Sequence, residues 1–517
     1  MSRMRHDAGC AEAAGPLAHQ YEALSVTPRP RRRLRALGAA ATVTAGALVA
    51  PVAASAAEVP EEGFGTNVQS IGQSVVDIVG EINMFWLIFG TALVFLMQVG
   101  FLGLELGFSR GKSVGAGVAK IIVNISIAAI AWWAIGFAIA FGGDKELFGD
   151  SGFFFQNGID FAGGTAGNGE ITTFMFQFTF AGVSLAIVWG STLERIKFIA
   201  YPIFGLVFVG LIYPLVAHAG WSGSGLFSNI GAGALDFAGS TIVHLTGATA
   251  ALAAAIVLGP RLGKYDKDGK PRAIPGHNMP LFGIGVIILW LGWFGFNGAS
   301  TGATDGGFFS HVIVVTNMGA AGGAIAAMIA IYLITKKFDV GMIGNGAIAG
   351  LVAVTAPAGF VEIWAAPLIG FVGGIVVVLG VLGIDRLRID DPVGATSAHG
   401  LAGIWGTLAA GLFASPRLVD EGQIGLFYGG GFGQLGTQAA TVAITFVFVF
   451  VVSYAVFKLI DVTIGLRVSA EEERAGLDIS EHGMYGYPEQ FIPEAELVGY
   501  SSDYAPVSTP KKKEIPA

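Results

Sequence analysis

The sequence predicts an all-α membrane protein with eleven transmembrane helices, arranged as two inverted five-helix repeats and a final helix. Of the 517 residues, 53% are hydrophobic and only 13% are charged, and the mean hydropathy is +0.66. A soluble domain carries about 25% charged residues. The 78 glycines lie largely inside apolar runs, where small residues let membrane helices approach closely. Eleven apolar stretches approach the ~20 residues that a bilayer requires.

Residues 1–57 have the features of a signal peptide with a long basic n-region. A basic run ends at Arg33, an alanine-rich apolar stretch covers 34–54, and an Ala-Ser-Ala site ends at Ala56. The alternative is a retained transmembrane helix. Because the stretch is short, rich in alanine and interrupted by Pro51, we expect cleavage near Ala56. The membrane domain is then 58–462 and the tail 463–517.

The eleven apolar stretches follow one another with short polar loops between them. An odd number of spans places the two ends of the domain on opposite sides of the membrane. One cysteine, Cys10, is present in the whole chain, which excludes a disulfide within it. The predicted spans cover 82–105, 116–142, 171–190, 198–218, 236–259, 280–298, 307–335, 342–360, 363–384, 396–415 and 434–459.

Basic residues in the loops orient the chain, because loops rich in Lys and Arg remain in the cytoplasm. The loops of the other side carry only Lys145 and Arg417. We therefore expect a plasma-membrane protein with its mature N-terminus outside and its tail in the cytoplasm. The 13 basic residues of the cytoplasmic loops are Arg110, Lys112, Arg195, Lys197, Arg261, Lys264, Lys267, Lys270, Arg272, Lys336, Lys337, Arg386 and Arg388.

Two histidines stand at the same distance after an aspartate near the start of a predicted span. His244 follows Asp236 by eight residues, and His399 follows Asp391 by eight. Eight helical residues rise ~12 Å, and the two spans run in opposite directions. Both imidazoles therefore approach the midplane of a ~30 Å core, as expected for a site between inverted repeats.

Ionisable side chains at membrane depth are costly, so a matched pair indicates function. Imidazole offers one donor and one acceptor when neutral and titrates near physiological pH. The pair could line a path for a small polar solute or relay a proton. The alternatives are two structural hydrogen bonds between helices, or a bis-histidine haem site. Small neighbours such as Gly247, Ala248 and Gly403 favour tight packing over a macrocycle.

Aromatic residues cluster in the third and sixth predicted spans and in the loop before Asp236. Phe176 and Phe180 share a helix face, Phe296 and Ser300 lie in or just after the sixth span, and Trp221 lies in that loop. Ring faces attract a small cation by about 0.5–2 kcal/mol, and a hydroxyl can accept its hydrogen bond. An interfacial aromatic belt is the alternative for such residues.

Several further sequence motifs occur between about 80 and 487. They are LERIKF at 193–198, DFAGSTIVH at 236–244, GWFGFN at 292–297, DDP at 390–392 with HG at 399–400, GLRV at 465–468, and GLD at 476–478 with HG at 482–483. These motifs resemble those of the Amt/Mep/Rh ammonium transporters and stand in the family's order. Trp221 and Ser300 favour the Amt branch, because Rh-type members lack the aromatic outer site.

The resemblance implies an ammonium and ammonia pathway in each subunit of a homotrimer with the eleven-helix fold. It also implies regulation by a PII-type signalling protein at the cytoplasmic face. Matching motif by motif, the outer recruitment site is Phe176, Trp221 and Ser300, the phenyl gate is Phe180 and Phe296, the twin histidines are His244 and His399, and Asp236 is the acid that assists deprotonation.

Three other functional classes compete with transport of this kind. A sensor that binds ammonium would need a signalling domain, and the tail is too short for one. An Rh-like channel for neutral ammonia or carbon dioxide differs in its electrical behaviour. An enzyme is not expected, because no nucleophile–base pair or metal-ligand set is visible. We expect no cofactor, no metal and no nucleic-acid partner.

Overall fold

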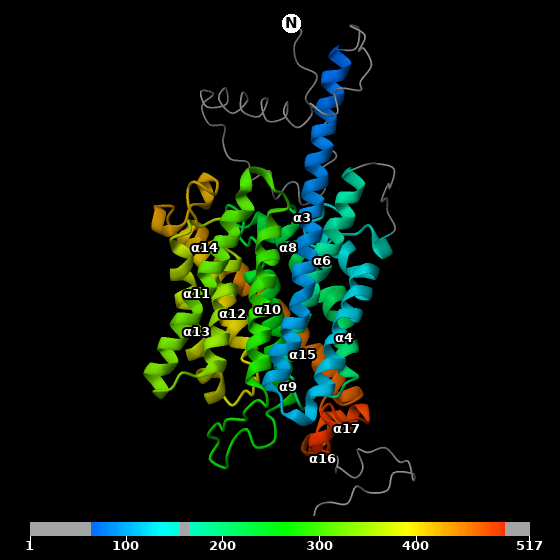
Figure 1. Cartoon of the computed structure of the whole chain (residues 1–517), viewed down its shortest axis with the longest axis vertical. Coiled ribbons are helices and arrows are strands. Elements are labelled where there is room, and N and C mark those ends of the chain that lie inside the picture. The colour runs from blue at the N-terminus through cyan, green and yellow to red at the C-terminus, as the bar shows by residue number, and fades with distance from the viewer. Residues whose placement is uncertain (1–63, 156–164, 492–517) are drawn as a thin grey trace, which may run out of the picture.

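The computed structural model describes residues 64–155 and 165–491, and every regular element in these ranges is helical (Figure 1). The predicted signal peptide at 1–57 lies outside the described residues. The principal helices are α3 (Phe64–Phe108), α4 (Val114–Ala131), α5 (Phe137–Phe141), α6 (Thr165–Gly190), α7 (Ala200–Val207), α8 (Tyr213–Trp221), α9 (Thr246–Leu258), α10 (Met279–Gly298), α11 (Phe308–Thr335), α12 (Val340–Thr355), α13 (Ala365–Arg386), α14 (Ala402–Phe413), α15 (Gly433–Thr463), α16 (Ala470–Ala475), α17 (Leu477–His482) and α18 (Pro488–Phe491).

Nine helical segments of the described chain are long and apolar enough to cross a membrane. The predicted span 342–360 corresponds to α12, which has 16 residues. The predicted span 396–415 is divided into the π-helical turn η11 (Thr396–Leu401) and α14. These two segments fall below the length of a full span, so the number of eleven remains a prediction.

Helix α3 is much longer than the predicted span 82–105. Its 45 residues correspond to ~67 Å of helix, about twice the thickness of a bilayer core. The N-terminal end of α3 projects beyond the other helices (Figure 1). Polar residues such as Asp77 and Glu81 interrupt the apolar pattern before residue 82. These polar residues lower the mean hydropathy, so the predicted span begins only at residue 82. They do not interrupt the helix, so α3 begins earlier than the predicted span.

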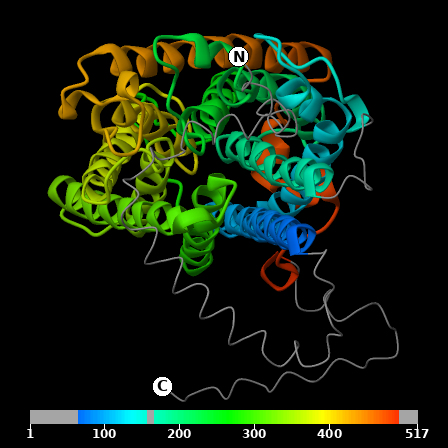
Figure 2. The same cartoon turned by 90° about the horizontal axis from the view of Figure 1, so that it is seen from above.

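Glycines allow the central helices to touch backbone to backbone. A Cβ added to Gly323 of α11 would lie 2.2 Å from the carbonyl oxygen of Gly346 in α12. A Cβ on Gly370 of α13 would lie 2.0 Å from the oxygen of Gly319. Neither gap admits a methyl group, so these helices pack through small residues, as membrane helices do. Viewed from above, α15 runs along one edge of the bundle and α3 lies at the opposite edge (Figure 2).

The first part of the tail folds against the bundle at the end opposite to the free end of α3 (Figure 1). The guanidinium of Arg467 donates to the carbonyl oxygens of Leu258 and Pro260 and to the carboxylate of Glu473. The buried carboxylate of Asp478 accepts from the backbone N–H of Ala116 in α4. The tail is therefore attached to the ends of α4 and α9.

Three loops meet in a buried ion cluster close to this tail. Asp390 accepts hydrogen bonds from the backbone N–H and the guanidinium of Arg261. Arg195 donates to the carbonyl oxygen of Asp390, and Glu194 pairs with Arg261 at 3.6 Å. Burial raises the pKa of Asp390, but the hydrogen bonds and charge of Arg261 and the charge of Arg195 outweigh it and hold the pKa at about 2.

Candidate functional site

The imidazoles of His244 and His399 meet inside the bundle. Their Nδ1 atoms lie 3.3 Å apart, and the ring centroids lie 5.3 Å apart with an angle of 22° between the planes. Both side chains are buried. Two facing nitrogens can share one proton, with one ring donating and the other accepting. The structure thus brings together the two histidines that the sequence spacing singled out.

The carboxylate of Asp236 sets the turn that carries His244. Its two oxygens accept from four consecutive backbone N–H groups at 2.8–3.0 Å, those of residues 239–242. Gly239 has φ +113°, a conformation that glycine adopts at little cost. The chain then enters the π-helical turn η8 (Ser240–Leu245), which holds His244. Such turns are frequent at functional sites.

The same local geometry recurs before His399. Asp391 accepts from the backbone N–H groups of Ala395 and Thr396 at 3.1 and 2.7 Å. Gly394 stands three residues after this aspartate, as Gly239 does after Asp236, and has φ +75°. The turn η11 then holds His399. The equal Asp-to-His spacing therefore reflects two similarly capped turns.

Aromatic rings form a continuous series that ends on the histidine pair. The rings of Phe180 and Phe296 stack at 4.0 Å with an angle of 16°. Phe176 contacts Phe180 at 4.7 Å on one side, and Phe296 contacts His244 at 5.4 Å on the other. Each of these four residues is at most 2% exposed: Phe176, Phe180, Phe296 and His244. A solute that followed this series would pass between apolar faces before it reached a nitrogen atom.

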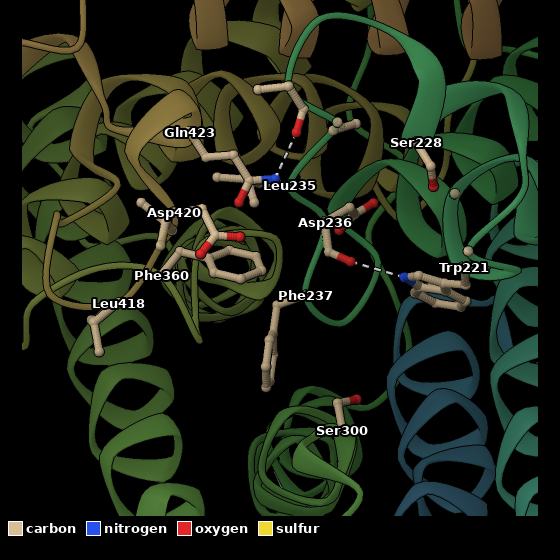
Figure 3. A pocket seen from close by; sticks show the side chains of 16 residues that line it. Trp221, Ser228, Leu235, Asp236, Phe237, Ser300, Phe360, Leu418, Asp420 and Gln423 are labelled. Atoms are coloured by element: carbon tan, nitrogen blue, oxygen red, sulfur yellow. Dashed lines mark hydrogen bonds between the residues drawn. The ribbon is translucent and has the colours of Figure 1, made fainter. Parts of the chain in front are cut away.

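A hollow of about 340 Å³ opens beside this series, and Trp221, Asp236 and Ser300 line it. Figure 3 shows these three residues around the hollow, each from a different segment. The indole Nε1 of Trp221 donates to the carbonyl oxygen of Asp236 at 2.8 Å, which fixes the indole ring. The Trp221 ring lies 6.0 Å from that of Phe180. Phe176 does not line the hollow. It belongs to the ring series through its contact with Phe180.

Two ring contacts of the histidine pair were missed from the sequence. Trp293 stacks on His244 at 5.0 Å and 22°, and its Nε1 donates to the hydroxyl of Thr355. Phe101 of α3 lies 6.3 Å from the ring of His399. Trp293 belongs to the GWFGFN motif and stands three residues before Phe296. This spacing could have been used to predict that Trp293 also lies near the histidine pair. Phe101 stands in an ordinary apolar stretch and gave none.

The haem alternative does not fit this geometry. Two axial nitrogens on one iron stand on opposite sides of a porphyrin plane, whereas the Nδ1 atoms of His244 and His399 are in direct contact. A Cβ added to Gly247 would lie 2.5 Å from the oxygen of Ser184, and one on Gly403 would lie 2.6 Å from the oxygen of Ser240. The described residues around the pair therefore leave no room for a macrocycle.

Comparison with known proteins gives one consistent result. The family model described as Ammonium Transporter Family matches residues 85–487. Ammonium transporter Amt2 of Archaeoglobus fulgidus is 41% identical over 429 residues, which are 80% of this chain and 90% of that protein. The ammonium transporter of Bacillus subtilis is 36% identical over 405 residues, 78% and 97% of the two chains.

Solved structures agree with this result. A structure described as Sensor Amt Protein superposes with a TM-score of 0.73 at 35% identity and covers 78% of this chain and 99% of its own. Mep2 of Candida albicans superposes with a TM-score of 0.67 at 28% identity and covers 75% and 87%. These similarities extend over the bundle that holds the histidine pair.

Proposed function

Because this chain belongs to the ammonium transporter family, we propose that it moves ammonium across the membrane by separating the ion from its proton at the ring series. Ammonium enters the hollow lined by Trp221 and Ser300. Ammonia then passes the stacked rings of Phe180 and Phe296 and reaches His244 and His399. The observation that supports this path most directly is the contact between the two imidazoles at the end of an aromatic series.

The outer hollow is suited to a small cation that gives up water. The indole face of Trp221 provides the cation–π attraction in the hollow, and the ring of Phe176, which contacts Phe180, extends it along the ring series, where water is excluded. The carbonyl oxygens near Asp236 and the hydroxyl of Ser300 can accept hydrogen bonds from ammonium. The carboxylate of Asp236 orients this backbone and assists the loss of the proton.

Loss of the proton follows from the cost of a bare charge beyond the hollow. The stacked Phe180 and Phe296 rings offer no hydrogen-bond acceptor, and an unpaired ion in such surroundings is costly. Ammonia is neutral and can hydrogen-bond to the imidazoles one after the other. The proton travels separately by way of His244 and His399, so that uptake carries charge. Potassium has no proton to lose and is rejected.

We extend the proposal to the assembly and to the topology. Each subunit of a homotrimer holds one path, and eleven spans place the N-terminus outside and the tail in the cytoplasm. The basic loops support this topology, and the homotrimer follows only from the resemblance to the family. A PII-type signalling protein would bind at the cytoplasmic face.

Electrical recording from the purified protein in liposomes tests the proposal. An ammonium step should evoke an inward current, and an equal potassium step should evoke none. A sensor is the second candidate, because one structural relative is named Sensor Amt Protein. Binding of ammonium without any flux would favour the sensor, whereas flux without current would favour a gas channel.

A further inference from the structure

A buried ion pair joins α3 and α4 near the end of the ring series. The Nζ atom of Lys120 donates to Oε2 of Glu105, and the two side chains are 1% and 2% exposed. The second oxygen, Oε1 of Glu105, has no hydrogen-bond partner among the described residues. Charges buried at membrane depth are costly and usually functional. The path described above uses neither residue.

Glu105 and His399 line the same small cavity. Its volume is about 20 Å³, and Phe101, Gly190 and Asn345 also contribute to its wall. A site of roughly this size holds one water molecule when polar partners surround it. The Nδ1 atom of His399 faces His244, so Nε2 is the ring nitrogen that is left for a second partner. A water in the cavity could therefore join Nε2 of His399 to Oε1 of Glu105.

The order of contacts along α3 places Glu105 beyond the histidine pair. A Cβ on Gly90 would lie 3.4 Å from the ring of Phe176, so this part of α3 is level with the outer end of the series. Phe101 is level with His399. Glu105 comes one turn later and only three residues before α3 ends at Phe108. It thus lies between His399 and the basic loop that we assign to the cytoplasm.

We propose that Glu105 is the group that accepts the proton from His399 and passes it to the cytoplasmic side, with Lys120 holding the carboxylate ionised between transfers. This inference rests on the proposed function. The Nε2–H bond of protonated His399 breaks, the bridging water takes that proton, and one of its own protons bonds to Oε1 of Glu105. His399 is then neutral again. Glu105 releases the proton to water at the end of α3 and regains its charge beside Lys120.

Paired variants of Glu105 test this step in the full chain reconstituted in liposomes. Glu105→Gln keeps the shape of the side chain and removes its proton chemistry, so the ammonium-evoked current should fall at least tenfold. Glu105→Asp keeps a carboxylate, so a part of the current should return, with its pH midpoint shifted. The control is Asp461→Asn, which removes a partly exposed acid of α15 that pairs with Lys458 and should leave the current unchanged. Wild-type current in Glu105→Gln, or an unshifted pH profile in Glu105→Asp, overturns the proposal.

A double variant separates proton transfer from simple charge balance. Glu105→Gln leaves Lys120 buried without its partner, and this charge could itself block the path. In Glu105→Gln/Lys120→Gln no charge is left, and we expect the current to stay at least tenfold below that of the wild type. Recovery of the current would show that Glu105 only neutralises Lys120. If the folded wild-type protein itself gave no ammonium current, the proposed function would fail, and that result differs from every result above.

Discussion

The Nδ1 atom of His244 lies 3.3 Å from the Nδ1 atom of His399, although 155 residues separate them in the chain. Two neutral rings can make this contact only if one carries its proton on Nδ1 and the other on Nε2. A proton added at one end of the pair therefore changes the tautomer that the other ring can adopt. The pair therefore has two tautomeric states, one with the Nδ1 proton on His244 and one with it on His399, and a proton relay requires two such states.

Replacing both histidines should abolish the ammonium-evoked current. In His244→Ala/His399→Ala the described rings that contact the pair, those of Phe101, Trp293 and Phe296, offer no group that takes up a proton. Solid-supported membrane recording on proteoliposomes measures the effect, with the elution profile as a check of folding. If the double variant kept its full current and its preference for ammonium over potassium, the relay would be refuted.

The spacing of Asp236 and His244, repeated at Asp391 and His399, led to the right prediction that the two imidazoles approach each other, although the eight residues are not one helix as we expected, because η8 begins only at Ser240 and η11 at Thr396. It succeeded because the distance from a capping carboxylate to a side chain in the following turn is a local property of the chain. The resemblance to a known family added Phe180 and Phe296, whose stacking depends on two helices far apart in the sequence.

The contacts of Phe101 and the cavity beside Glu105 could not be predicted in this way. Both depend on how α3 is rotated against η11, and nothing in the local sequence of α3 determines that rotation. The length of α3 was also underestimated, because hydropathy measures suitability for lipid and a helix can continue through polar residues such as Asp77 and Glu81. We predicted one span over 396–415, which the structure divides into η11 and α14. Hydropathy could not show this division, because an apolar run need not be one regular helix.

Opening the stacked ring pair should raise conduction and reduce selectivity. Phe296→Ala removes the ring that lies 4.0 Å from Phe180 and leaves a path that water can enter. Because water stabilises ions there, we expect a potassium-evoked current to appear, while Phe296→Leu should retain more of the barrier. Currents evoked by ammonium and potassium are compared in the same preparation. Continued exclusion of potassium by Phe296→Ala would contradict the assignment of a gate.

Removing the Asp236 carboxylate should destabilise the fold as well as the site. Asp236→Ala leaves four backbone N–H groups at the start of η8 without their acceptor, and the loss of such buried bonds costs about 3 kcal/mol or more. The melting temperature in detergent should fall. Asp420→Asn is the matched control, because this exposed aspartate lines the same hollow. Equal melting temperatures for Asp236→Ala and the control would argue against the capping role.

The cluster around Asp390 should make the stability of the protein depend on pH in the acid range. The folded pKa of Asp390 is about 2, below the value of about 3.9 expected in an unfolded chain. The ionised carboxylate therefore stabilises the fold fully above about pH 4, by roughly 2–3 kcal/mol, and this contribution is lost as the pH falls through 4 towards 2. Thermal unfolding of the detergent-solubilised protein over this range measures it.

Variants of the two partners show whether this pH dependence arises from the Asp390–Arg261 pair. Asp390→Asn cannot ionise, so the difference in stability between it and the wild type should be largest near neutral pH and should narrow as the pH approaches about 3. Arg261→Gln should narrow the difference in the same way, because it removes the guanidinium that lowers the pKa of Asp390. Carboxylates that contact neither Asp390 nor Arg261 titrate equally in the wild type and the variants, so their effects cancel in the comparison; Glu194, which pairs with Arg261, keeps this partner in Asp390→Asn. A difference that stayed constant from neutral pH to about pH 3 would mean that Asp390 has the same pKa in the folded and unfolded chains, contrary to the buried hydrogen bonds that Arg261 donates to it.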